Sequence, residues 1–70
     1  MTTLDLHGIR HSEVDRMVEN FILMNQNTLP LTIVCGNSKT MIDLVNKVVE
    51  RIGCKTHSFQ YGKIIVREII

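Results

Sequence analysis

The chain has little of what several classes of small protein depend on. Its 70 residues include no tryptophan, one tyrosine and one proline, and its two cysteines, Cys35 and Cys54, lie too far apart to form a CxxC pair. A metal-ligand spacing of cysteines is therefore absent, and the two thiols indicate reduced core residues of a cytoplasmic protein. No apolar run approaches the ~20 residues that cross a bilayer, so no membrane partner is expected.

Neither sign of charge is in large excess. The formal net charge is +1, which gives no bulk electrostatic case for nucleic acid, so any such case depends on how the charges are distributed. Hydrophobic residues make up 44% of the chain, which is enough for a core and argues against disorder. The length fits one small domain over residues 1–70.

The hydrophobic pattern predicts six elements in the order β-α-β-α-β-β. Ser12 suits the N-cap of the first helix, Ser38 or Thr40 that of the second, and Gly53 its left-handed C-cap. Strands are expected over Thr2–His7, Leu31–Cys35, Cys54–Gln60 and Lys63–Ile70, and helices over Glu13–Asn25 (or Gln26) and Met41–Ile52.

Strands that alternate with helices predict parallel pairing, and a turn at Tyr61-Gly62 predicts a final antiparallel hairpin. The expected fold is an α/β two-layer sandwich. It has a four-stranded mixed sheet, with both helices on one face.

Ligands of open α/β sheets bind at the carboxyl ends of the parallel strands. Three predicted loops meet there, and they carry much of the chain's polar chemistry. Gly8, Arg10 and His11 belong to the first loop, Gly36–Thr40 to the second, and Lys63 ends the third. Arg10, Lys39 and Lys63 can therefore form a locally basic edge on a nearly neutral protein.

Asp5 and His7 alternate with Leu4 and Leu6 at the end of the first predicted strand. The carboxylate and the imidazole would share one face there and could exchange a proton or orient one another. The alternative is a solvated polar pair on an uncovered sheet face. For His11 two roles are equally expected: an ordinary loop histidine, or a member of the same site as Asp5 and His7. His57 is expected to be structural or at the surface.

The loop Gly36-Asn37-Ser38-Lys39-Thr40 opens the second helix. Its backbone N–H groups and Lys39 would suit a phosphate, whereas an ordinary strand-to-helix turn is the alternative. The loop lacks the GxxxxGK[ST] pattern, so a nucleoside triphosphate site is disfavoured.

Leu4-Asp5-Leu6-His7-Gly8 resembles the LDLHG motif that opens Smr (small MutS-related) domains, and the order of the later elements resembles that family over nearly the whole chain. Gly36 matches the first glycine of the family's second motif, HGxG or TGxG. Cys35 and Ser38 depart from that motif, and Tyr61-Gly62 is a reduced form of its later glycine-rich turn.

The resemblance implies a single Smr-like domain that acts as a DNA-nicking or RNA endonuclease, with Asp5 and His7 in the active site. Phosphates would be held by Gly8, Arg10, His11, Gly36, Asn37, Ser38, Lys39, Thr40 and Lys63. RNA could supply its own 2′-hydroxyl as nucleophile and needs no cofactor, whereas DNA cleavage makes a divalent metal ion more expected.

Two other functions stay open. One is a module that binds nucleic acid or the ribosome without cutting it, which the altered second motif favours. The other is a protein-interaction adaptor that uses the open sheet face around Ile65 and Ile69. We expect a homodimer or a larger protein partner to supply targeting.

Overall fold

Two segments with apolar residues at helical spacing and four strand segments form the elements of the fold, and the strand segments Leu31–Val34 and Lys63–Ile69 are rich in β-branched residues. The computed structural model describes residues 2–69, and the side chains of these except residues 55–60. Strands β1 (Thr2–Asp5), β2 (Leu31–Val34), β3 (Cys54–Gln60) and β4 (Lys63–Ile69) and helices α1 (His11–Met24) and α2 (Lys39–Ile52) follow the predicted order. The predicted end of the last strand, Ile70, and the side chain of His57 lie outside the described residues.

The four-stranded mixed sheet that the sequence predicts, with parallel pairing of the strands that alternate with helices, is wrong in its arrangement. The strands lie in the order β1-β2-β4-β3, so only β1 and β2 form a parallel pair. Strand β3 joins the sheet through β4 alone, and its register shifts between Cys54 and Thr56 and between Thr56 and His57. The apolar β4 takes the place beside β2, and the more polar β3 is left as an irregular edge.

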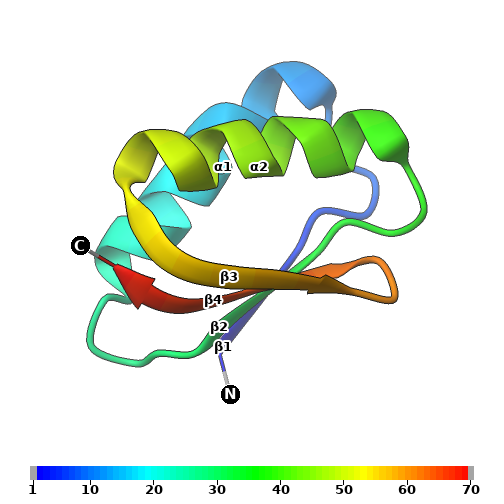
Figure 1. Cartoon of the computed structure of the whole chain (residues 1–70). Coiled ribbons are helices and arrows are strands. Elements are labelled where there is room, and N and C mark those ends of the chain that lie inside the picture. The colour runs from blue at the N-terminus through cyan, green and yellow to red at the C-terminus, as the bar shows by residue number, and fades with distance from the viewer. Residues whose placement is uncertain (1, 70) are drawn as a thin grey trace.

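Both helices cover the same face of the sheet, as Figure 1 shows. The chain is thus an α/β fold with two helices, and the core fills the space between its two layers. Residues that face this space are almost fully buried: Leu6, Val14, Val18, Ile22, Leu31, Ile33, Val45, Val48, Val49, Ile64 and Val66. Ile65 lies on the opposite, open face of β4, whereas Ile69 packs against the core, contrary to the open-face patch predicted for an adaptor.

The helix starts differ from those predicted. Helix α1 begins at His11 with Arg10 as its N-cap, and Ser12 lies inside the first turn, because the Glu13 N–H closes that turn on the Arg10 carbonyl at 2.9 Å. Helix α2 begins at Lys39. Its N-cap is Ser38, whose hydroxyl accepts the Met41 N–H at 3.2 Å, one of the two caps expected.

On the outer surface of the helix layer, Arg51 of α2 donates two hydrogen bonds to the Asp15 carboxylate of α1, at 2.7 and 2.8 Å. This pairing lowers the pKa of Asp15. Gly53 ends α2 at φ +90°, in the left-handed conformation that the sequence predicts.

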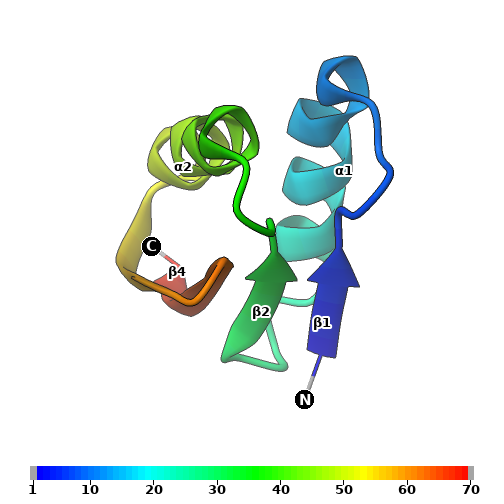
Figure 2. The ribbon, with the colours of Figure 1, turned by 90° about the vertical axis from the view of Figure 1, so that its right-hand side faces the viewer.

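Strands β1, β2 and β3 run in one direction, because β4 is antiparallel to both β2 and β3. Their carboxyl ends therefore lie at one end of the molecule, which faces the viewer in Figure 2. We call this the loop end and define it as residues 7–11, 36–40 and 61–63. Within the residues that the structure covers, no helix is long and apolar enough to span a membrane.

Candidate nucleic-acid interface

The first loop of the loop end is a tight turn that starts two residues earlier than predicted. Strand β1 ends at Asp5, and the Ile9 N–H closes a turn on the Leu6 carbonyl at 3.1 Å, with Gly8 at φ +80°. The Asp5 carboxylate accepts the backbone N–H of His7 at 2.9 Å. His7 therefore lies in an exposed turn rather than beside Asp5 on a strand face, and Asp5 holds the backbone that carries the imidazole.

The second loop is joined to the third by two backbone hydrogen bonds. The Gly62 carbonyl accepts the N–H of Cys35 at 2.7 Å and the N–H of Gly36 at 3.0 Å. The Gly36 amide is therefore already satisfied, and the prediction that it holds a phosphate is wrong in this conformation.

Four other amides of the second loop remain available. The N–H groups of Asn37, Ser38, Lys39 and Thr40 have no hydrogen-bond partner among the residues that the structure describes, and all four residues are exposed. Two of them are the first positions of α2, where the helix leaves its N–H groups unpaired. Of the predicted phosphate-binding residues of this loop, Asn37, Ser38, Lys39 and Thr40 keep an available N–H group, and Gly36 does not.

The two hydrogen bonds to the Gly62 carbonyl leave almost no space between the second and third loops. A Cβ atom placed on Gly62, which has φ +76°, would lie 2.9 Å from the Gly36 carbonyl oxygen and 3.1 Å from its carbon. Position 62 therefore requires glycine for two reasons: its φ is positive, and a Cβ atom would clash with the Gly36 carbonyl. We call this pairing the Gly36–Gly62 contact.

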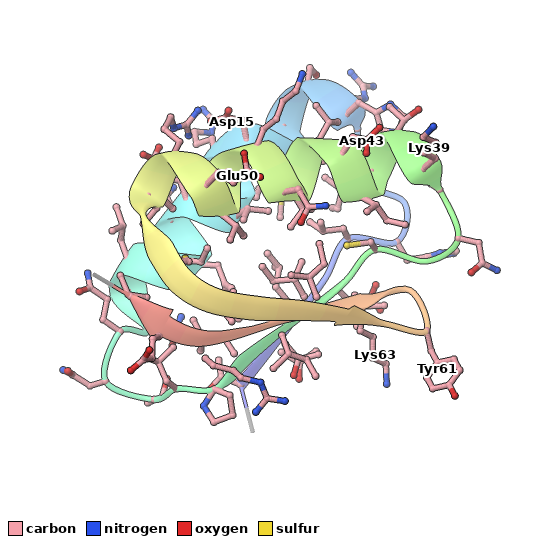
Figure 3. All side chains as sticks on the ribbon, in the orientation of Figure 1. Asp15, Lys39, Asp43, Glu50, Tyr61 and Lys63 are labelled. Atoms are coloured by element: carbon pink, nitrogen blue, oxygen red, sulfur yellow. The ribbon has the colours of Figure 1, made fainter. Side chains whose placement is uncertain are left out.

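Lys39 and Lys63 lie at the loop end but on different sides of it. In Figure 3 the Lys39 side chain rises from the helix layer, and the Lys63 side chain extends from the open face of the sheet. The convergence of these two amines that the sequence predicts is therefore wrong, because helix α2 and strand β4 belong to different layers. A ligand that reaches both has to pass around the end of the molecule.

The loop end gathers several basic side chains. Its residues include Arg10, Lys39 and Lys63 together with His7 and His11, while the carboxylates of Asp5, which binds the His7 N–H, and of Glu13 in the first turn of α1 lie directly beside it. Both helices also begin there, so both positive dipole ends add to the same potential. Three of the chain's cations thus lie at this end, although the whole chain carries a net charge of only +1.

Cys35 does not belong to this exposed chemistry. Its side chain is 8% exposed and joins the core, where burial raises the pKa of the thiol to about 11. A thiol with that pKa is almost wholly protonated at neutral pH, so Cys35 is a packing residue rather than a nucleophile.

One exposed residue of the loop end was absent from the predicted site. Tyr61 is 90% exposed and has a positive φ of 49°. The sequence does contain a sign of this residue. An aromatic residue stands at the first position of the two-residue hairpin turn, where asparagine, aspartate or glycine is usual.

Among the side chains that the structure describes, no three His, Cys, Asp or Glu residues are grouped so as to hold a metal ion. Comparisons of the chain with protein-family models, with curated proteins and with solved structures find no match. The resemblance to Smr domains therefore rests on the residues quoted above.

The Gly36–Gly62 contact gives a direct stability prediction. Gly62→Ala should destabilise the fold by about 3 kcal/mol, since the substitution adds a steric clash of about 1–3 kcal/mol to the cost of a left-handed alanine. Gly8→Ala is the matched control. It has a similar φ but no atom within 4 Å of its Cβ, so it should cost only about 1 kcal/mol. Urea unfolding of both variants measures the difference, and equal losses would contradict the contact.

Proposed function

We propose that this chain is a nucleic-acid-binding domain that holds a sugar–phosphate backbone at its loop end. The observation that carries the proposal is the coincidence of unpaired amides at residues 37–40, two helix N-termini and three cations in one exposed region. Phosphate oxygens accept hydrogen bonds from such amides and are attracted by such a potential.

The arrangement favours an extended polyanion over a single small phosphate compound. Lys39 and Lys63 extend from different layers, so successive phosphates of a strand suit the two amines better than a single phosphate group does. Arg10 lies at the N-terminus of α1 and offers a further contact. The backbone of a nucleic acid supplies such a series of negative charges.

The departures from the Smr motif are compatible with this proposal. Ser38 has φ −80°, a value that any residue adopts, and it caps α2 in place of a second glycine. Cys35 packs in the core, so its place in the motif does not weaken the exposed surface. The similarity of Leu4–Gly8 to LDLHG therefore supports an Smr-like function on a loop of altered composition.

Binding can be measured by the anisotropy of a labelled oligonucleotide at several salt concentrations. Lys39→Ala and Lys63→Ala should each weaken binding for every sequence tested and reduce the slope of log K against log salt by about one, since each variant removes one phosphate contact. Lys47→Ala is the matched control, because Lys47 is an exposed lysine of α2 outside the loop end. Equal effects of all three variants would contradict the proposed interface.

Phosphodiester cleavage is the second candidate function, and the turn that presents His7 favours it. The Asp5 carboxylate fixes the His7 backbone, and the imidazole is exposed within the loop end. On RNA, His7 would take the proton of a 2′-hydroxyl as that oxygen attacks the adjacent phosphorus, and the 5′-oxygen of the next nucleotide would leave. On DNA a water molecule would attack instead, for which a divalent ion would be needed.

We expect His7→Ala to slow RNA cleavage about 100-fold or more, with little change in binding, because it removes the proton acceptor. Lys47→Ala serves as the control, since Lys47 is exposed on α2 outside the loop end. Products are followed on RNA, on its 2′-deoxy analogue, and with magnesium or a chelator present. Unchanged cleavage by His7→Ala would exclude this mechanism, whereas binding without product from any substrate would leave a binding-only domain.

A further inference from the structure

Tyr61 is an exposed aromatic residue that packing does not explain. Its side chain is 90% exposed, so the ring contributes little to the core. Its φ of 49° lies in the left-handed region, and Tyr61 is the one non-glycine residue with positive φ in the part of the chain that the structure describes. Such a conformation disfavours an aromatic side chain and persists where the surrounding structure holds it.

The turn that carries Tyr61 is held firmly in place. Gln60 pairs with Lys63 across the hairpin, and Gly62 has φ +76°, so both central residues have the positive φ of a type I′ turn. The Gly62 carbonyl accepts the N–H groups of Cys35 and Gly36, which fixes the tip against the second loop. The backbone that carries the ring is therefore fixed, so contact with a ligand has to order only the side-chain torsions of Tyr61.

The position of the ring matches the proposed interface. In Figure 3 Tyr61 extends from the hairpin tip at the loop end, and Lys63 lies just beyond it on β4. Asn37 and Ser38, whose amides are unpaired, follow Gly36 directly on the neighbouring loop. A planar ring beside phosphate-binding groups is the arrangement by which proteins hold unpaired bases, with the ring stacked on the base.

We propose that Tyr61 stacks on an unpaired nucleobase, and that the loop end consequently selects single-stranded over double-stranded nucleic acid. The inference rests on the proposed nucleic-acid binding and adds the class of ligand. The faces of paired bases are covered by their neighbours in a duplex, so a projecting ring can reach only a base that is free of its stack. Since every base has an aromatic face, the preference should hold for DNA and for RNA.

The test compares Tyr61→Phe and Tyr61→Asn with the unaltered chain. Phenylalanine keeps a ring that can stack. Asparagine removes the ring and suits positive φ, so Tyr61→Asn should fold with equal or greater stability, as thermal melting verifies. The probes are labelled twelve-residue oligothymidine and oligouridine, a duplex of the same length, and an abasic oligonucleotide that keeps the phosphates without the bases.

We expect Tyr61→Asn to bind both single strands about 5- to 100-fold more weakly, which is the effect of losing one stacked base. Binding of the duplex and the abasic strand should not change, and Tyr61→Phe should retain most of the affinity. Tyr61 is the only tyrosine and the chain has no tryptophan, so quenching of its intrinsic fluorescence by the single strands reports directly on this ring.

Two negative results are distinguishable. In the first, the unaltered chain binds the abasic strand, and Tyr61→Asn binds every probe as tightly as the unaltered chain does. The stacking role is then wrong, and the phosphate interface stands. If the unaltered chain binds none of the probes, the proposed function fails and the stacking role fails with it.

Discussion

The pairing of one carbonyl with two amides organises the loop end of this protein. The Gly62 carbonyl accepts the N–H groups of Cys35 and Gly36, and the two glycine backbones touch where a side chain would clash. This contact joins the tip of the β3–β4 hairpin to the loop that opens α2. Because β4 also pairs with β2, the hairpin, the central strand and the start of the helix form one connected unit.

This connection has electrostatic consequences. With the Gly36 amide occupied, the unpaired N–H groups lie at residues 37–40, where they face outward at the positive end of α2. The turn after β1 brings Arg10 and the start of α1 to the same end, since the Leu6 N–H binds the Val34 carbonyl at 3.0 Å beside the second loop. A nearly neutral chain thereby places three cations and two helix N-termini at one end through local placement rather than net charge.

Local sequence patterns were sufficient to predict the order of the elements, the turn at Tyr61-Gly62 and the clustering of three loops at one end. The periodicity of apolar residues reports local structure, and the alternation of strands with helices, followed by a hairpin, indicates the direction of each strand. It does not report which strand lies beside which, because β3 and β4 both have strand-like patterns and only long-range packing decides that β4 pairs with β2. The same limit explains why Lys39 and Lys63 were expected to converge, although they belong to different layers.

The details of the candidate site depended on hydrogen bonds that sequence spacing does not specify. The Asp5 carboxylate accepts a hydrogen bond from the His7 N–H, and the Gly62 carbonyl accepts one from the Gly36 N–H. Neither bond follows from residue type alone. Ser38 was recognisable as a possible cap because serine commonly takes that role, whereas Ser12 has the same chemistry and lies inside a helix. The sequence predicts the turn that contains Tyr61, but it does not predict that the residue is exposed, because exposure depends on how the elements pack.

The central claim is that phosphates bind at the loop end, and amide chemical shifts measured by NMR test it most directly. Labelled protein is titrated with the abasic strand, which offers phosphates alone. The account predicts that the largest shifts occur at residues 37–40, with smaller ones at residues 7–11 and 61–63. Shifts concentrated at the opposite end, around residues 25–28, or on the outer surface of the two helices would contradict it.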